Sequence, residues 1–149
     1  MKNLFFLFLL ISMASCQKEG KLTYTEKRLI GSWFYTDVDF MERWSLKKDD
    51  VTNDYFGDIL TFKNDFSFMY EDSDAGLVFE GVWQVNQVST YNSGSNSSSM
   101  VETLIASYKN TVTGEIIQLV WDDLWVNKTH IRSNNSDKEG HYTFELKKF

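Results

Sequence analysis

Hydrophobic and polar residues alternate with a period of two along most of the chain after residue 31. Phe66, Phe68 and Tyr70 alternate with Ser67 and Glu71, and the same pattern recurs later in the chain. Because successive side chains of a strand point to opposite faces, each run predicts a half-buried antiparallel strand. The predicted strands cover residues 32–42, 58–63, 66–71, 77–86, 101–109, 115–121, 124–131 and 140–148.

Short turn sequences separate these predicted strands. Lys63-Asn64-Asp65 predicts a tight hairpin, and residues 72–76 and Gly114 predict two further turns. The polar segments 89–99 and 132–140 predict loops. Sequential antiparallel strands with short connections close most simply into an eight-stranded up-and-down barrel, because closure removes exposed edges. We therefore predict an all-β fold, preceded by a short helical turn that ends at Gly31.

The first predicted strand breaks the alternation. Phe34, Val38 and Phe40 fall on the face opposite Trp33 and Tyr35 if the period of two continues unchanged. Apolar side chains on both faces require either a β-bulge, which shifts the alternation by one residue, or burial of both faces.

The N-terminal residues have the order of a secretory signal. The apolar run 4–11 follows Lys2 and is too short to span a bilayer as a helix. The only cysteine of the 149-residue chain, Cys16, follows the small residues Ala14 and Ser15. This position resembles the lipobox of bacterial lipoproteins, in which the cysteine begins the mature protein and carries acyl chains such as palmitate. The alternative is an ordinary signal, cut near Ala14 or Ser15, that leaves a free thiol.

The residues after the cysteine add to this resemblance. Gln17-Lys18-Glu19 resembles the tether found in surface-exposed lipoproteins of Bacteroidota-type bacteria. The chain then divides into a signal peptide (1–15), a lipidated tether (16–26) and one barrel domain (27–149). The resemblance implies a protein held at the outer membrane of the cell envelope, and leaves open which face of that membrane carries it.

A second resemblance concerns the barrel itself. The sequence LIGSW, residues 29–33, resembles the Gly-x-Trp start of lipocalins. LTFKNDFSF, GVWQV and GHYTFEL resemble the lipocalin-like domains of Bacteroidota lipoproteins, and the likeness covers residues 27–148. It implies a lipocalin-like barrel with Gly31 and Trp33 as the structural motif at one end. Lipocalins usually pair this tryptophan with a late arginine; the basic candidates here are Arg132, Lys147 and Lys148.

The charge and the motifs of the chain limit its function. The formal net charge is −6 and the pI is near 4.9, so nucleic acid is not an expected partner. The sequence contains no Gly-x-Ser-x-Gly elbow, phosphate loop or His-Glu-x-x-His motif. We therefore expect a protein that binds rather than catalyses, with no catalytic residue and no cofactor.

Two groups of residues have the types found in metal sites. His130 and His141 lie on the last two predicted strands, where a hairpin can bring them together, but no third ligand has a suitable spacing. We interpret them as surface histidines. The acidic loop 49–58 contains Gly57, but its spacing does not follow the EF-hand pattern and favours a solvated loop. No metal site is therefore expected.

Aromatic residues make up 16% of the chain and supply the remaining functional signal. By alternation, the inward positions hold Tyr35, Phe68, Tyr70, Phe79, Trp83, Trp121 and Tyr142. Such side chains either fill an eight-stranded barrel or line a cavity for one small ligand, and both interpretations stay open. The candidate ligand-binding residues are Tyr35, Tyr70, Phe79, Trp83 and Trp121. Gly81 and Ala106 are small residues that would leave room for the ligand.

These features predict a membrane-anchored lipoprotein that binds a small hydrophobic or ring-bearing ligand. Its expected partners are the lipid bilayer, through acylated Cys16, and that ligand. The alternative is a non-catalytic accessory or interaction protein that uses loops 43–57 and 87–100 on a filled barrel. Trp44 and Trp125 fall off the inward register and indicate an exposed contact or a sugar platform.

Overall fold

The chain folds into an antiparallel β-barrel with one short strand outside it. The computed structural model describes residues 21–92, 97–110 and 113–149. The barrel strands are β1 (Gly31–Glu42), β3 (Ile59–Phe62), β4 (Ser67–Asp72), β5 (Leu77–Asn92), β6 (Ser97–Lys109), β7 (Ile116–Val126), β8 (His130–Ser136) and β9 (Gly140–Lys148). The other elements are helix α1 (Tyr24–Leu29), strand β2 (Asp49–Asp50) and the 3₁₀-helix η1 (Thr52–Tyr55). Cys16 and the predicted signal peptide lie outside the described residues.

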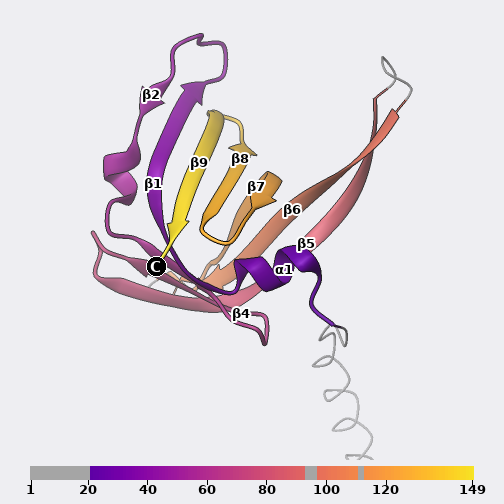
Figure 1. Ribbon diagram of the computed structural model, residues 1–149. Helices are drawn as coiled ribbons and strands as arrows, with labels where there is room; N and C mark the ends of the chain where they lie inside the picture. Colours follow the sequence, from indigo (N-terminus) through magenta and orange to yellow (C-terminus); the bar gives the residue numbers. More distant parts are fainter. Residues whose placement is uncertain (1–20, 93–96, 111–112) are drawn as a thin grey trace, which may run out of the picture.

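Each barrel strand pairs with the next barrel strand along the chain, and β1 pairs with β9 to close the circle. The circle contains eight antiparallel strands, which confirms the predicted all-β barrel. Strand β2 pairs only with β1, opposite Asp39 and Phe40, and lies outside the circle. Figure 1 shows β1, β9 and β8 side by side, with β4 and the first part of β5 crossing near their lower ends.

Two predicted boundaries near the C-terminus are wrong. Residues 124–131 span the end of β7, a turn and the start of β8. The polar segment 132–140, predicted as a loop, belongs to β8 as far as Ser136. One of the polar residues of β8, Ser133, is buried, and its hydroxyl donates to the carbonyl oxygen of Asp122 at 2.7 Å. A serine bonded in this way satisfies its hydroxyl inside the barrel, although its residue type suggests a loop.

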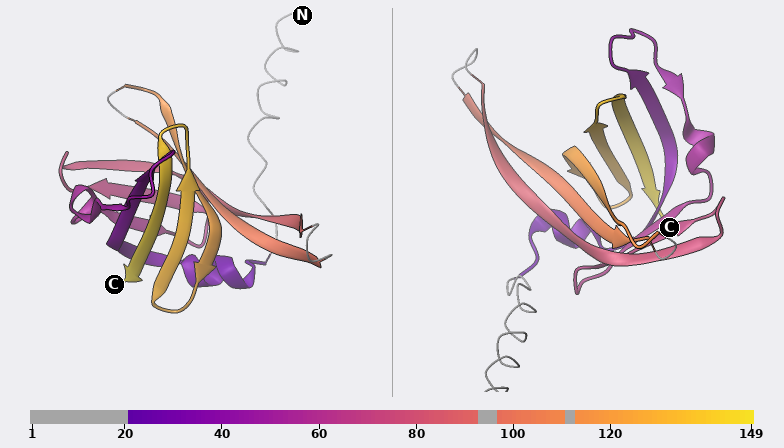
Figure 2. Two further views of the ribbon diagram at one scale, coloured as in Figure 1. Left: turned by 90° about the horizontal axis from the view of Figure 1, so that it is seen from above. Right: turned by 180° about the vertical axis from the view of Figure 1, so that it is seen from behind.

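The other predicted loop, residues 89–99, is also largely strand. Strands β5 and β6 stay paired as far as Asn92 opposite Ser97. Strand β4 pairs with β5 only up to Val82, and β7 pairs with β6 only from Leu104 onward. The far part of β5 and β6 is therefore a two-stranded ribbon that projects from the barrel (Figure 1, Figure 2).

Aromatic side chains fill the centre of the barrel. The buried aromatic residues are Trp33, Tyr35, Phe62, Phe68, Phe79, Trp83, Tyr108, Trp121 and Phe144. The ring centroids of Trp121 and Phe144 are 5.8 Å apart, and those of Phe62 and Trp83 are 5.5 Å apart. An eight-stranded barrel has an interior about wide enough for such side chains to fill. The filling interpretation therefore holds for the centre of the barrel.

A β-bulge in β1 determines which of its side chains reach this core. Tyr35 and Asp37 pair with consecutive residues of β9, so Thr36 is the extra residue of β1. Tyr35 and Val38 are buried, whereas Thr36 is exposed. Of the two predicted alternatives for this strand, the bulge is confirmed.

Helix α1 covers one end of the barrel and begins at a capping box. The Thr23 hydroxyl accepts a hydrogen bond from the backbone N–H of Glu26, and the Glu26 carboxylate accepts one from the backbone N–H of Thr23. Glu26 and Leu29 are fully buried, so the folded domain includes residues 24–26, which the sequence division assigns to the tether. Among the described ranges, no helix has the length and apolar character needed to cross a membrane.

Trp33 lies beside α1 and has no exposed surface. Its indole N–H donates to the carbonyl oxygen of Leu29 at 2.7 Å. The Lys148 Nζ atom lies 5.0 Å from the ring centroid of Trp33 and donates to the carbonyl oxygens of Arg28 and Ile30. Burial lowers the pKa of Lys148. Lys148 thus links the end of β9 to the end of α1, and its side chain covers the ring of Trp33.

Gly31 allows this close approach. Its φ is +129°, a conformation that residues with a side chain rarely adopt, and a Cβ there would lie 2.5 Å from Lys148 Cε. Lys147 and Arg132 are exposed, so Lys148 is the residue among the three basic candidates that lies on Trp33. Gly31 and Trp33 therefore lie together at one end of the barrel.

Candidate functional site: the tyrosine cluster

Tyrosines gather on the side of the barrel away from α1. The tyrosine cluster consists of Tyr35 on β1, Tyr55 on η1, Tyr70 on β4, Tyr108 on β6 and Tyr142 on β9. The ring centroids of Tyr35 and Tyr55 are 4.9 Å apart, and those of Tyr70 and Tyr108 are 5.7 Å apart. Phe144 links Tyr142 to the first of these pairs, since its ring lies 5.8 Å from that of Tyr142 and 6.0 Å from that of Tyr35. Residues from five separate elements thus meet at one place.

Helix η1 brings Tyr55 into the cluster by filling a gap along β1. Strand β3 pairs with β1 only as far as Phe34, and β2 pairs with β1 only at residues 39–40. Between these pairings the edge of β1 has no strand beside it on this side, and η1 packs there. The Tyr55 side chain then reaches the rings of Tyr35 and Phe144.

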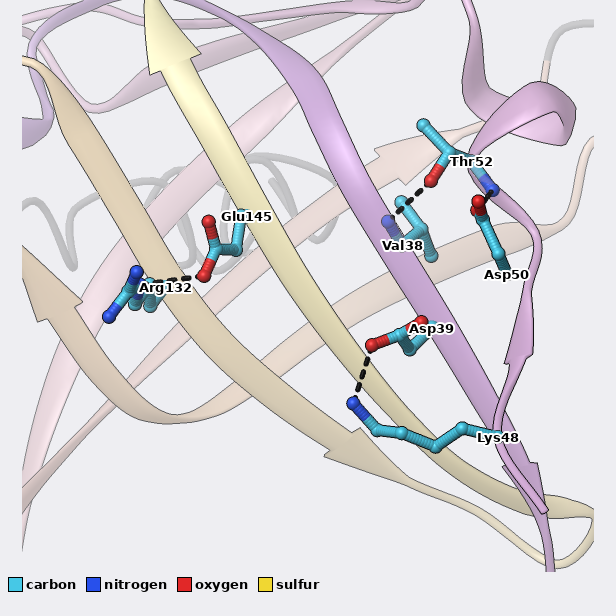
Figure 3. Close-up of polar contacts among 7 residues, drawn as sticks. All are labelled: Val38, Asp39, Lys48, Asp50, Thr52, Arg132 and Glu145. Carbon is cyan, nitrogen blue, oxygen red and sulfur yellow. Dashed lines mark hydrogen bonds and ion pairs between the residues drawn. The ribbon is translucent and has the colours of Figure 1, made fainter.

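Backbone and side-chain hydrogen bonds hold η1 in this gap (Figure 3). The backbone N–H of Val38 donates to the Thr52 hydroxyl at 2.9 Å, and the Val38 carbonyl accepts from the N–H of Val51 at 2.8 Å. The Asp50 carboxylate accepts from the backbone N–H of Thr52 at 2.9 Å. Both polar backbone groups of Val38, which a neighbouring strand would otherwise satisfy, are therefore used to position η1.

Asp58 is the buried carboxylate of the cluster, with 3% of its surface exposed. One of its oxygens accepts a hydrogen bond from the Tyr70 hydroxyl at 2.5 Å, and the other accepts one from the backbone N–H of Ser73 at 2.8 Å. A buried charge needs such donors, because an uncompensated carboxylate is costly in a low-dielectric interior. Asp58 therefore fixes the position of the Tyr70 ring.

Burial keeps the hydroxyl groups of the cluster protonated. Burial raises the pKa of Tyr35 well above its usual value; Tyr55, once it ionises, and the Asp58 carboxylate add to this effect by repelling a second negative charge. Burial, and then the hydrogen bond to Asp58, raises the pKa of Tyr70. Burial is also the main cause of the raised pKa of Tyr108. At neutral pH the cluster therefore presents neutral O–H donors around one carboxylate.

The hydroxyl groups of Tyr35 and Tyr108 face accessible space. Neither makes a hydrogen bond with any described residue. Every fully buried side-chain nitrogen or oxygen of the described residues does have a partner. The two hydroxyl oxygens must therefore touch space that a water molecule can enter, although Tyr35 is only 8% exposed and Tyr108 only 6%. The barrel is filled at its centre, but these donors are left available at the cluster.

Most of the predicted ligand-binding residues belong to this region. The ring of Tyr35 lies 6.4 Å from that of Trp121, and the ring of Tyr70 lies 6.0 Å from that of Phe79. All four were identified from their inward positions in an alternating sequence. Tyr35 and Tyr70 contribute hydroxyl groups, whereas Trp121 and Phe79 form apolar walls behind them.

Trp83 does not join the cluster. Its ring packs on Phe62, and its indole N–H donates to the carbonyl oxygen of Lys63 at 3.0 Å, beside the turn between β3 and β4. The expectation that Gly81 leaves room for a ligand is wrong. A Cβ on Gly81 would lie 2.0 Å from the carbonyl oxygen of Ser107, so the backbone of β6 already occupies that space.

The sequence did not single out Tyr55, Tyr108 or Asp58. Tyr108 has a usable signal, because it shares the inward face of β6 with Ala106. Tyr55 and Asp58 belong to the segment 49–58, which has no periodicity and was interpreted as a solvated acidic loop. That interpretation is wrong for Asp58. Its carboxylate is buried and accepts a hydrogen bond from the Tyr70 hydroxyl on the neighbouring strand β4.

The two histidines that were weighed as metal ligands do not come together. His130 pairs with Lys147 and His141 pairs with Ser136, so the two histidines lie at opposite ends of the β8–β9 hairpin. His130 is exposed, in agreement with its interpretation as a surface residue, and His141 is half-buried. Within the described part of the chain, no three His, Cys, Asp or Glu side chains are grouped as metal ligands would be.

Comparisons of the chain with protein-family models, with curated proteins and with solved structures found no match. No function is therefore transferred to this chain from a relative.

Proposed function

We propose that this protein is a lipid-anchored binding protein that takes one small ring-bearing ligand at the tyrosine cluster. The observation that carries the proposal is that the Tyr35 and Tyr108 hydroxyls face accessible space and have no hydrogen-bond partner within residues 21–92, 97–110 and 113–149. Small-molecule sites typically combine aromatic walls with a few polar groups that fix orientation. The cluster has this composition, and its donors are neutral. The favoured ligand is uncharged, carries a ring and offers a hydrogen-bond acceptor.

Asp58 organises this site rather than contacting the ligand. Each of its oxygens already accepts a hydrogen bond, from Tyr70 and from the backbone of Ser73. A cationic ligand would have to compete with these donors for a carboxylate that is almost fully buried. This arrangement favours a neutral ligand over an amine.

The proposed anchor is acylated Cys16, with the bilayer as the partner of its acyl chains. The described chain begins at residue 21 and enters the barrel through α1 (Figure 1). Two or three acyl chains give stable anchoring, since a single chain gives only marginal membrane binding.

Ligand binding is tested by screening uncharged ring compounds that carry a carbonyl or ether acceptor, with tryptophan fluorescence as the signal. Trp121 lies against Tyr35 and reports on the cluster. For a compound that binds saturably, Tyr35→Phe and Tyr108→Phe should each weaken affinity by about 3–10-fold, because one neutral hydrogen bond is worth about 0.5–1.5 kcal/mol.

The matched control is Tyr24→Phe, which removes a tyrosine hydroxyl from the exposed surface of α1. Its affinity should equal that of the parent. The ligand proposal fails if no compound binds saturably, or if Tyr24→Phe weakens binding as much as Tyr35→Phe.

The anchor is tested separately by replacing Cys16 with alanine and fractionating the cells. The variant should move from the membrane fraction to a soluble fraction, while a serine-to-alanine change at Ser15 should keep the protein at the membrane. A Cys16→Ala variant that stays as membrane-bound as the parent would contradict the lipidated anchor.

The second candidate function is that of an accessory or interaction protein on a filled scaffold. The aromatic packing at the centre of the barrel favours it, as does the exposure of apolar side chains on loop 43–57 and on the ribbon. These exposed side chains are Trp44, Leu46, Phe56, Val88 and Met100. A chain that binds no small molecule but loses a protein partner when the ribbon is shortened would support this candidate over the first.

A further inference from the structure

A groove opens at the end of β1, between the β1–β2 connection and the β8–β9 turn. It encloses a hollow of about 530 Å³, and a second hollow of about 640 Å³ adjoins it. Both hollows are lined by Glu42, Arg43, Trp44 and Lys138, and we call this the Trp44 groove. It lies outside the barrel and shares no lining residue with the tyrosine cluster.

Hydrogen bonds fix the shape of the groove, one of them between its two walls and two of them within the β8–β9 turn. The backbone N–H of Arg43 donates to the carbonyl oxygen of Glu139 at 3.0 Å, which joins the β1–β2 connection to the β8–β9 turn. The Asp137 carboxylate accepts from the backbone N–H groups of Glu139 and Gly140, at 2.8 and 2.9 Å. The groove is therefore formed before any ligand arrives, which lowers the entropic cost of binding.

Trp44 stands in the groove with 95% of its surface exposed. The backbone N–H of Ser45 donates to the carbonyl oxygen of Glu42, so Trp44 is the third residue of a four-residue turn. Its φ is +102°, a value that glycine or asparagine normally supplies at such a position. The energetic cost of this backbone conformation is not offset by burial of the indole. Backbone strain of this kind is concentrated at binding sites.

The charges around the indole indicate the class of ligand. The first hollow is lined by two acidic residues, Glu42 and Asp137, and by two basic ones, Arg43 and Lys138. The second hollow has the same balance, with Glu139 in place of Asp137. Opposite charges in equal number favour an uncharged ligand that both donates and accepts hydrogen bonds. A pyranose ring has such hydroxyl groups at its rim and an apolar C–H face, which packs flat on an indole. We infer that the Trp44 groove binds a neutral oligosaccharide.

The groove fits this ligand better than a protein partner. An aromatic hot spot of a protein interface is typically surrounded by a patch that excludes water. Trp44 is instead surrounded by charged side chains and by two open hollows, where several sugar hydroxyls can exchange hydrogen bonds with carboxylates and cationic groups. The nearest cation, Arg43, lies 5.7 Å from the ring centroid and leaves the indole largely free.

The test titrates the full-length chain, in a detergent without a sugar headgroup, with cellotetraose, maltotetraose and chitotetraose. At least one of them should produce a saturable blue shift of tryptophan emission and protect Trp44 from acrylamide quenching. Trp44→Ala should weaken that binding at least tenfold, and Trp44→Phe should weaken it less, because a smaller ring keeps part of the contact.

The matched control is Trp125→Ala, which removes a half-exposed tryptophan on β7. Of the two tryptophans that the sequence places off the inward register, Trp125 lines neither hollow of the groove, so its removal should leave the affinity unchanged. Tyr35→Phe should also leave it unchanged, so that this site is distinguished from the tyrosine cluster. Trp44→Gly should abolish sugar binding while keeping or raising the melting temperature, because glycine accepts the φ of this turn without strain. That result would exclude unfolding as the cause of the loss.

Three outcomes would overturn the inference. The first is that none of the tetrasaccharides binds saturably at millimolar concentration. The second is that Trp125→Ala weakens binding as much as Trp44→Ala. The third is that Trp44→Ala leaves sugar binding intact but abolishes a concentration-dependent association of two copies in sedimentation experiments, which would make the groove a protein interface.

Discussion

The polar side-chain groups at the two ends of the barrel differ in whether they have hydrogen-bond partners among the described residues. At the α1 end, the indole N–H of Trp33 has an acceptor in Leu29, and the ammonium group of Lys148 has acceptors at the end of α1. At the other end, the hydroxyls of Tyr35 and Tyr108 have no hydrogen-bond partner among the residues that the structure describes, and the indole of Trp44 is exposed to solvent. Both ends are rich in aromatic residues, so composition does not distinguish them.

The difference indicates which end stabilises the fold and which end is available for binding. Groups with internal partners contribute to the free energy of unfolding, because water would have to replace those partners in the unfolded chain. Groups without partners contribute little to stability, yet they are the ones that a ligand can satisfy. Substitutions should therefore lower stability at the α1 end and affect binding at the tyrosine cluster.

The largest expected effect is at Trp33. Trp33→Ala should lower the free energy of unfolding by about 3–5 kcal/mol, because it removes a fully buried indole and leaves a cavity. Urea unfolding at neutral pH measures this loss. Trp125→Ala is the control, and should change stability by less than about 0.5 kcal/mol because that indole is half-exposed. If Trp33→Ala lowers the free energy of unfolding as little as Trp125→Ala does, the α1 end is not the end that stabilises the fold.

Alkaline pH should act on the tyrosine cluster. The raised pKa of Tyr35 and of Tyr70 means that the folded protein keeps protons that the unfolded chain loses near pH 10. Their contribution to stability is therefore complete below about pH 10 and is lost as the pH rises above it. The slope should reach about 1.4 kcal/mol per pH unit for each residue.

The measurement is a series of urea titrations between pH 8 and pH 11.5. The double variant Tyr35→Phe, Tyr70→Phe should flatten the decline, whereas Tyr24→Phe on the surface of α1 should not. A decline that is the same in all three proteins would show that groups elsewhere cause it.

A smaller effect is expected at Lys148. Lys148→Ala should lower stability by about 1–2 kcal/mol, because the carbonyl oxygens of Arg28 and Ile30 lose a charged donor and the Trp33 ring loses its cover. The neighbouring Lys147→Ala is a matched control, since Lys147 is exposed and should change stability by less than about 0.5 kcal/mol. Equal losses for the two variants would show that Lys148 does not tie β9 to α1.

The smallest effects distinguish hydroxyl groups within the tyrosine cluster. Tyr70→Phe should lower the free energy of unfolding by about 1–2 kcal/mol, because it removes a hydrogen bond to the buried Asp58 carboxylate. Tyr35→Phe should be close to neutral, because its hydroxyl makes no hydrogen bond with any residue in the described part of the chain. Thermal and urea melts of the two variants, compared side by side, check this difference. A loss of more than about 1 kcal/mol for Tyr35→Phe would mean that its hydroxyl is bonded in solution.

The barrel itself was predictable, because alternation is a local property that survives tertiary packing. It identified β4 and β5, and it located Tyr35, Tyr70, Phe79 and Trp121 on inward positions. It failed in β8, where Ser133 is buried and bonded to a backbone carbonyl on β7. It also failed in the ribbon, because a two-stranded segment that is solvated on both faces has the same polar sequence as a loop.

The site was only partly predictable, for a different reason. Tyr55 enters the cluster because Val38 and Thr52 hold η1 in a gap of the sheet, and no sequence period encodes that gap. Asp58 is buried because Tyr70, on the next strand, lies across from it. Both features depend on which segments become neighbours after closure, and the sequence alone does not specify this.

The bulge at Thr36 has a consequence for changes of length in the barrel. If Thr36 is removed, strict alternation still places Trp33, Tyr35 and Val38 on the inner face and Asp37 on the outer face. Thr36 is therefore equivalent to one residue inserted into a regular strand, with its side chain turned outward. Removing a residue elsewhere in β1 would instead move every later side chain of the strand to the opposite face of the sheet. Tolerance to insertions and deletions in β1 should therefore be concentrated at this one position.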